Sequence, residues 1–169
     1  GGTYAWNFGA GAAPATSTAY NPPAVVYSTP GIKVITLTVT RNGCSATTTD
    51  TVIVRPRPVV AFTTTPASGC APLTVSFNNT TATVGGETWS WTFGDGGTSN
   101  LQNPPPHVYT NPGPGTLIRT VKLVVDNGFG CADSVTHTVA IYPLPTAGFN
   151  SPSQACVTFP VPFTNTSTG

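Results

Sequence analysis

Few side chains in this sequence have the chemistry that catalysis or metal binding requires. The chain of 169 residues has five acidic residues and two histidines. The acids are scattered at Asp50, Glu87, Asp95, Asp126 and Asp133. Asp95, in the glycine-rich stretch 94–97, is the one candidate metal ligand. Calcium, however, prefers about six to eight oxygen ligands, usually several carboxylates, and the acids of this sequence are scattered. We favour a structural role for Asp95, with the carboxylate accepting backbone N–H groups in a turn.

The remaining candidates for chemistry also have structural interpretations. His107 and His137 have no cysteine or serine in a nucleophilic arrangement, and no hydrolase, zinc-protease or phosphate-loop motif occurs. We therefore predict a protein that is not an enzyme and has no cofactor. Trp89, Trp91 and Phe93 share one strand face and could stack on a sugar, but such aromatic residues are more often core. We assign Trp91 to the core.

Composition excludes several classes of protein. Charged residues make up 7% and the formal net charge is +1, so no basic surface is available for nucleic acid. Hydrophobic residues at 38% suffice for a core, and no apolar run reaches the roughly 18 residues of a membrane span. Without an initiator Met or a signal peptide, the sequence is expected to be an internal piece of a longer protein. Its four cysteines favour an oxidising, exported location.

Internal repetition is the strongest pattern. Residues 6–11 (WNFGAG) return as residues 91–96 (WTFGDG), and residues 35–39 return as 121–125. Further landmarks recur in the same order at nearly the same offset: Asn21-Pro22-Pro23 and 103–105, Cys44 and Cys131, Phe62 and Phe149, Cys70 and Cys156, 75–80 and 161–166. Such spacing predicts a tandem array with a period of about 85 residues.

The elements that carry these residues are predicted to be strands. Alternating or β-branched runs occur at 32–40, 51–54, 89–93 and 136–141, separated by glycine, proline and asparagine turns. We predict an all-β protein of tandem two-sheet sandwiches. Proline-rich joints at 55–58 and 142–145 divide it into the C-terminal part of one repeat (1–57), a complete repeat (58–143) and the N-terminal part of the next (144–169).

The complete repeat resembles the PKD (polycystic kidney disease) domain. The resemblance rests on a strand end, a second strand motif and the Pro112-Gly113 turn that follows them. The residues of the two motifs are Trp91, Phe93, Gly94, Asp95, Gly96, Asn103, Pro104, His107 and Tyr109. Trp6, Phe8 and Gly9 repeat part of it, but Ala10 replaces the aspartate. The resemblance implies an immunoglobulin-like sandwich of an extracellular or cell-surface protein, similar to the tandem PKD arrays of large secreted Bacteroidota adhesins. The loss of the acid at Ala10 argues against a chemical role shared by all repeats.

The immunoglobulin-like topology bears on the cysteines. It would place Cys70 in the first inter-strand turn and Cys131 in the last hairpin, at opposite poles and roughly 30 Å apart. That distance exceeds the span of a disulfide. We therefore expect Cys44, Cys70, Cys131 and Cys156 to be candidates for bonds between repeats, with partners outside this sequence.

Two further possibilities stay open at this stage. Asp50-Thr51-Val52 and Asp133-Ser134-Val135 resemble O-glycosylation sites of exported Bacteroidota proteins, with Thr51 and Ser134 as acceptors, but we favour the alternative that they are polar residues of an edge strand. The last residues of the sequence, followed by the first, also correspond to one nearly complete repeat. Residues 146–169 are either part of an excerpt from a long array or a donor of strands to a neighbouring copy.

These observations predict a structural or adhesive stalk module of a large exported protein or filament. Its expected partners are neighbouring repeats, copies of itself, and a surface glycan or protein ligand. The alternative is an accessory module of a secreted hydrolase that binds carbohydrate or protein. An exposed aromatic patch would favour that alternative.

Overall fold

The structure is a computed structural model that describes residues 1–83 and 85–168. It divides into two compact units, Gly1–Arg57 and Pro58–Gly169. The described residues form strands and turns without any helix, so no helix in them could cross a membrane. The prediction of an all-β protein is confirmed. The division into one complete and two partial repeats stays a prediction.

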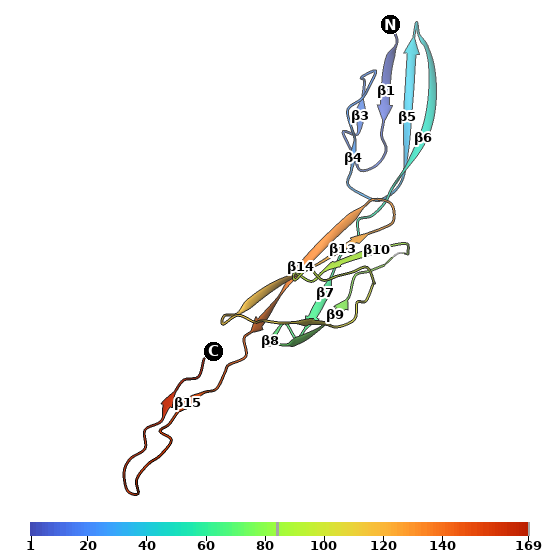
Figure 1. Ribbon diagram of the computed structural model, residues 1–169. Coiled ribbons are helices and arrows are strands. Elements are labelled where there is room, and N and C mark those ends of the chain that lie inside the picture. Colours follow the sequence, from blue (N-terminus) through green and yellow to red (C-terminus); the bar gives the residue numbers. More distant parts are fainter. Residues whose placement is uncertain (84, 169) are drawn as a thin grey trace. The chain divides into compact units, whose positions relative to one another are not determined.

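The first unit is a single sheet with a small ribbon beside it (Figure 1). The sheet has the order β3-β1-β5-β6, and β2 pairs with β4. The strands are β1 (Thr3–Asn7), β2 (Ala12–Ala13), β3 (Thr16–Ser17), β4 (Val26–Tyr27), β5 (Gly31–Arg41) and β6 (Cys44–Val54). Asn42 and Gly43 both have positive φ and join β5 to β6 in a two-residue turn, as an Asn-Gly pair between alternating strands predicts.

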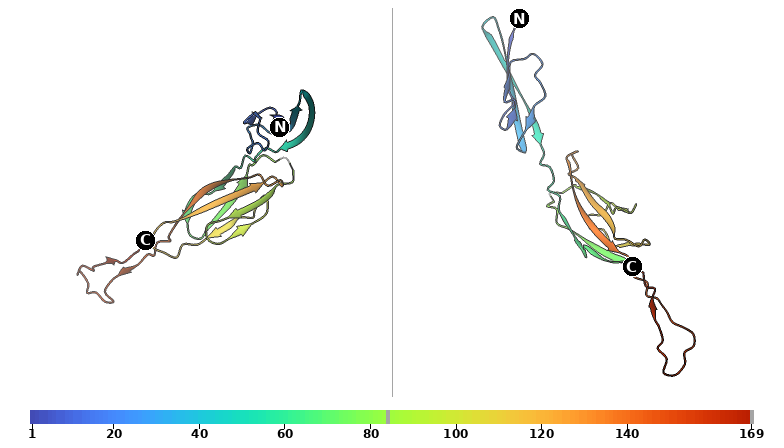
Figure 2. Two further views of the ribbon diagram at one scale, coloured as in Figure 1. Left: turned by 90° about the horizontal axis from the view of Figure 1, so that it is seen from above. Right: turned by 90° about the vertical axis from the view of Figure 1, so that its left-hand side faces the viewer.

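The second unit contains a two-layer sandwich (Figure 2, right). One sheet has the order β11-β10-β13-β14-β8 and the other β12-β9-β7. The strands are β7 (Phe62–Thr65), β8 (Ser68–Cys70), β9 (Leu73–Asn79), β10 (Thr88–Thr92), β11 (Thr98–Ser99), β12 (His107–Tyr109), β13 (Leu117–Asp126) and β14 (Ala132–Tyr142). In the described residues after 142, β15 (Phe149–Asn150) and β16 (Thr164–Asn165) form a short hairpin, and Thr146 and Thr168 form an isolated bridge.

The core of the sandwich follows from strict alternation along its strands. In β9 and β13, every second side chain points inward, so apolar residues meet between the sheets while the intervening threonines and lysine face solvent. Trp91 lies at the centre and is fully buried, with the Phe62 and Phe77 rings 4.9 and 5.7 Å from its own. The other buried members are Ala71, Leu73, Val75, Phe93, Tyr109, Val121, Leu123, Val125, Val139 and Ile141.

Candidate functional site

The family motif residues gather at the end of β10, where the chain makes a tight glycine turn. The Phe93 N–H donates to the Gly97 carbonyl at 2.9 Å, and Gly94 has a φ of 84°. The Asp95 carboxylate accepts the Gly97 N–H at 3.0 Å. This is the backbone bond that the glycine-rich sequence predicted for Asp95.

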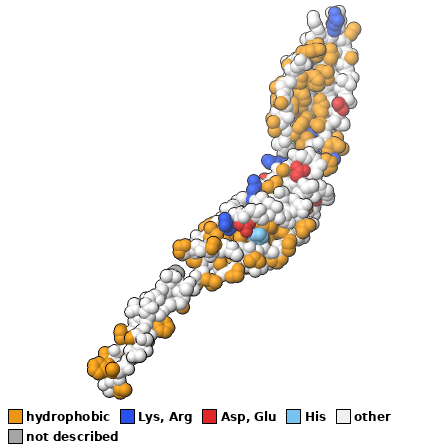
Figure 3. All heavy atoms as spheres, in the orientation of Figure 1, with side chains coloured by type: hydrophobic (Ala, Val, Ile, Leu, Met, Phe, Trp, Pro, Cys, Tyr) orange, Lys and Arg blue, Asp and Glu red, His pale blue; other side chains and the backbone are white. Residues whose placement is uncertain are grey.

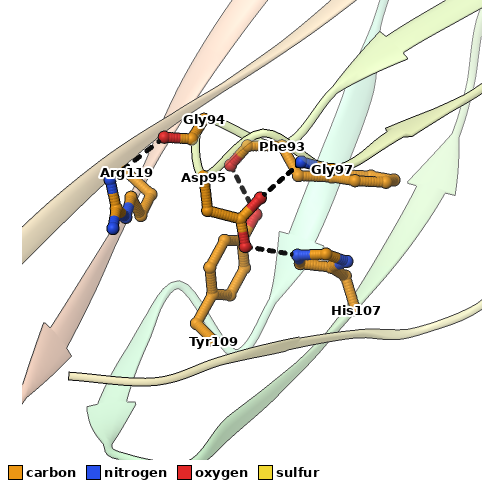
Figure 4. Close-up of polar contacts among 7 residues, drawn as sticks. All are labelled: Phe93, Gly94, Asp95, Gly97, His107, Tyr109 and Arg119. Carbon is orange, nitrogen blue, oxygen red and sulfur yellow. Dashed lines mark hydrogen bonds and ion pairs between the residues drawn. The ribbon is translucent and has the colours of Figure 1, made fainter. Parts of the chain in front are cut away.

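A second contact joins Asp95 to the opposite sheet. Strand β12 brings the His107 Nε2 atom to 2.6 Å from Asp95 Oδ2 (Figure 4). The imidazole stacks on the Phe93 ring at 4.4 Å and meets the edge of the Tyr109 ring at 4.7 Å. Both side chains are only 23% exposed. The acid–histidine pair therefore ties the β10 turn to β12.

Tyr109, also on β12, makes a second connection between β12 and the β10 turn. Its phenol, which is buried, donates a 2.9 Å hydrogen bond to the Phe93 carbonyl. Burial, and then the negative charge of Asp95, raise the pKa of Tyr109 above its usual value. On the outer side, Arg119 Nη1 donates to the Gly94 carbonyl at 3.2 Å (Figure 4). The Phe93 and Gly94 carbonyls thus each accept a hydrogen bond from a side chain.

The electrostatics of Asp95 favour its charged form. Burial raises its pKa, but the hydrogen bonds from His107 and Gly97 and the charge of His107 outweigh burial and hold the pKa below its usual value. The cluster has one carboxylate and no nucleophile. In the described ranges, 1–83 and 85–168, no group of three or more His, Cys, Asp or Glu side chains is placed to hold a metal ion. The arrangement is suited to holding two strands together.

The other motif residues support the same turn. Trp91 Nε1 donates to the Leu101 carbonyl at 2.9 Å, which fixes the loop that contains Asn103 and the buried Pro104. Gly96 has a φ of 100° at the exposed tip of the turn. Trp91 has no exposed surface and cannot stack on a sugar, and Trp89 packs against the core. The aromatic strand face is core rather than a binding platform.

Residues 1–57 repeat part of this arrangement. Trp6 Nε1 donates to the Ala19 carbonyl at 3.0 Å, and the Tyr27 hydroxyl donates to the Phe8 carbonyl at 2.9 Å. Gly9, with a φ of 81°, takes the place of Gly94. The acid and its histidine are absent together, because Ala10 stands for Asp95 and Val25 for His107.

The contact between Asp95 and His107 was not predicted from the sequence, because the two residues were interpreted separately. Their joint absence in the first unit was the signal that could have paired them. Two polar residues that contact each other between two sheets tend to be absent together from a related repeat, because either one alone would be left without its hydrogen-bond partner.

The four cysteines are free in the described part of the chain. Cys70 pairs with Tyr142 at one end of β14, and Cys131 precedes the other end of that strand. Their separation along the strand is about 36 Å at about 3.3 Å per residue. Disulfides to partners outside this sequence stay a prediction.

Thr51 and Ser134 lie exposed on β6 and β14. The backbone N–H of each residue donates to the carboxylate of the preceding aspartate, at 2.7 and 2.8 Å. The two sites lie at different levels of the sheet, because Asp50 pairs with Ile35 whereas Asp133 pairs with Val125. His137, opposite Val121, is the positional counterpart of Asp50. Glycosylation stays a prediction.

We expect the Asp95–His107 contact to stabilise the protein in a pH-dependent manner. A carboxylate whose pKa is lowered by folding adds stability above its unfolded pKa of about 4, and this stability is lost as the pH falls through the lower folded value. The Asp95→Asn variant should therefore lose less stability than the wild type between about pH 5 and pH 2. Urea unfolding at several pH values measures this. Asp133→Asn, which removes an exposed acid of β14, is the control, and equal behaviour of the two variants would refute the expectation.

The match to a family model agrees with this fold. The family model described as "PKD domain" matches residues 55–142, just over half of the chain. A protein from Methanosarcina mazei, solved by solution NMR, is 30% identical with a TM-score of 0.32, and the match covers 53% of this chain and 55% of that one. The amphioxus IgVJ-C2 molecule is 13% identical with a TM-score of 0.36, and the match covers 82% of this chain and 87% of that one.

This chain therefore spans little more than half of the Methanosarcina mazei protein. No curated protein matches it. PKD domains occur mostly in extracellular proteins. The alternating core, the two sheets, the glycine turn tied to Tyr109 and the match over residues 55–142 lead to one conclusion: the chain belongs to the PKD domain family.

Proposed function

We propose that this chain is part of a non-enzymatic shaft of tandem PKD repeats in a large exported surface protein or filament. The observation that carries the proposal is the recurrence of one set of contacts. The Trp Nε1 and Tyr hydroxyl bonds of residues 58–143 have counterparts of nearly equal length in residues 1–57. The sheet order β3-β1-β5-β6 likewise matches β11-β10-β13-β14.

The path of the chain through the sandwich supports a shaft. Phe62, at the start of β7, contacts His137 in the middle of β14, whereas β14 ends at Tyr142 beside Cys70. Entry and exit are thus separated by at least five residues of strand, about 17 Å at about 3.3 Å per residue. Repeats that enter at one level and leave at another add length when they are joined in series.

The joints also suit this role. Pro56 and Pro58 precede the sandwich, and Pro143 and Pro145 follow it. Proline fixes φ and removes a backbone donor, so these segments resist both helix formation and continuation of the strand ladder. A chain of sandwiches connected in this way is a semi-rigid spacer. The weakly charged, threonine-rich surface is suited to contact with other copies or with attached glycan.

Single-molecule pulling on the full-length native protein tests the proposal. Each sandwich of about 85 residues should unfold in one event and release roughly 280–300 Å of chain, at an extended length of about 3.3–3.6 Å per residue. A series of evenly spaced events is the expected result. Irregular increments, or one dominant event from a large catalytic domain, would contradict the repeat shaft. Reducing conditions serve as the control, because disulfides would shorten the increments.

A further inference from the structure

The last strand of the sandwich of residues 58–143 has a free edge. Among the described residues of this sandwich, β14 pairs along its whole length with β13, but on its other side it pairs only with β8, over Ala140–Tyr142. Residues 133–138 are exposed apart from Val135, which is half-buried. The strands of the sandwich all lie within residues 62–142, so this edge does not depend on where the sequence begins or ends.

The other edges of the sandwich are short or flanked by proline. β11 has two residues and β8 has three, Pro66 follows β7, and Pro104, Pro105 and Pro106 precede β12. An unpaired edge is a template for another strand, and proline removes the N–H donors that such pairing needs. Residues 131–142 contain no proline. The edge of β14 is therefore the one most able to pair with a further strand.

The direction of the backbone groups shows which residues would pair. The Ala140 N–H donates to the Ala67 carbonyl at 3.0 Å, on the side of β14 that faces away from β13. Backbone groups of alternate residues point to the same side of a strand, so those of Ser134 and Thr136 point to the free edge. The Ser134 N–H is held within its own strand, by the Asp133 carboxylate at 2.8 Å. A partner strand could therefore bond to Thr136 directly, and to Ser134 once Asp133 has released it.

Asp133 and His137 place an acceptor and a donor on this edge. Both side chains lie on the core-facing side of β14, opposite Val125 and Val121 of β13. The ring of His137 contacts the Phe62 ring, with 4.6 Å between the centroids, which restricts its position. Charged residues make up only 7% of the chain, and Figure 3 shows how isolated their side chains are on one face of the molecule. An acid and a histidine on one edge therefore give that edge a distinct polar pattern.

One antiparallel register with a second copy satisfies both the backbone and these side chains. A residue whose backbone points to the edge must lie opposite another of that kind, and Ser134 opposite Thr136 of the second copy meets this condition. The twofold axis then passes beside Val135. The same register places Asp133 opposite His137 of the second copy, in a pair without backbone bonds, where Cα atoms approach to about 4.5 Å. A shift of the partner by two residues in either direction breaks this match.

We propose that the free edge of β14 pairs antiparallel with the same edge of a second copy of the chain. The sheet β11-β10-β13-β14 then continues through the twofold axis into the sheet of the second copy, and the interface is isologous because both copies use the same residues. The Ser134 N–H exchanges the Asp133 carboxylate for the Thr136 carbonyl of the second copy. The released carboxylate accepts an N–H of His137 from that copy, which an imidazole donates in either protonation state.

The exchange leaves no donor or acceptor of these residues without a partner, so the contact carries no penalty for a buried unpaired group. The ladder is short, so a single contact is weak. Where several such sandwiches are joined in series, contacts along two chains would strengthen one another through their high effective concentration. The inference specifies a surface for the contact with other copies, but it rests on one sandwich and does not require the shaft.

Two charge variants, alone and mixed, test the proposal by sedimentation velocity in reducing buffer. The wild type should show an equilibrium between a monomer of 17.3 kDa and a dimer of twice that mass. Asp133→Lys places a lysine opposite His137, and His137→Glu places a second acid opposite Asp133, so each variant alone should dimerise at least about tenfold more weakly. In the mixture, the new lysine faces the new glutamate and the native pair is kept. The mixture should dimerise at least as tightly as the wild type.

Two further variants separate the edge from the rest of the surface. Thr136→Pro removes an N–H that points to the free edge and takes no part in the ladder with β13, so it should weaken the dimer and keep the fold. Thr74→Lys, at an exposed position of β9 in the other sheet, is the control for added charge and should dimerise like the wild type. Circular dichroism checks the strand content of each variant. If Thr136→Pro does not fold, the charge variants decide alone.

Three outcomes overturn the proposal: a wild type that stays monomeric up to its solubility, association that neither charge variant weakens, or a mixture that dimerises no more tightly than its two components. None of them changes the increments in the pulling experiment on the native protein, so failure here is distinguishable from failure of the shaft.

Discussion

Trp91→Ala is expected to remove a large part of the stability of the sandwich of residues 58–143. The side chain has no exposed surface, and truncation of a buried tryptophan costs about 3–5 kcal/mol. The substitution also removes the Nε1 donor of the Leu101 carbonyl, a loss of about 1 kcal/mol. Domains of this size are stable by only about 5–15 kcal/mol in total. Guanidinium unfolding followed by circular dichroism measures the effect.

Trp89→Ala is the matched control for this variant. It lies two residues earlier on the same strand, with the same side-chain size, but is only partly buried against the core. The loss of stability should be clearly smaller than for Trp91→Ala. Equal losses would mean that the Trp91 position is not the centre of the core and would contradict the packing described above.

Gly94→Ala is the second substitution with a large expected effect. The φ of 84° lies in the left-handed region, which costs a non-glycine residue about 1–2 kcal/mol. A Cβ at this position would also lie 2.6 Å from the Thr120 carbonyl oxygen, which is backbone and cannot turn aside. Movement of the turn away from β13 would stretch the Arg119 and Tyr109 bonds to residues 94 and 93. Thermal unfolding should show a marked fall in midpoint.

Gly96→Ala separates the two causes. Gly96 also has a positive φ, of 100°, but no atom lies within 4 Å of its added Cβ. Only the conformational cost remains, so the midpoint should fall by much less than for Gly94→Ala. If both variants behaved alike, the close approach of the turn to Thr120 would have no energetic role.

The all-β fold could be predicted from the sequence because strands and turns leave local, periodic patterns of residues. Alternation along residues 32–40, and the asparagine–glycine turn after them, predicted a strand and a hairpin that the structure contains. Trp91 could be assigned to the core because it lies on the apolar side of such a strand. These features depend on neighbours in sequence, which a single chain displays directly.

The candidate site was only half predictable. The bond between Asp95 and Gly97 spans two residues and follows from turn chemistry. The contact between Asp95 and His107 joins two sheets across twelve residues, and its existence depends on how β12 lies against the β10 turn. The exposure of Phe149 and Phe163 was likewise beyond sequence patterns, because the same pattern is buried at Phe62 and Phe77.

The short parallel pairing of β8 with the end of β14 has a mechanical consequence. The ladder of Ser68–Cys70 with Ala140–Tyr142 is flanked by two bonds, Ala140 N to the Ala67 carbonyl at 3.0 Å and Ala71 N to the Tyr142 carbonyl at 2.9 Å. A force on the two ends of the sandwich pulls these parallel strands in opposite directions, so all of the bonds are sheared at once and none can unzip before the others. We expect these bonds to resist such a force together and not one after another.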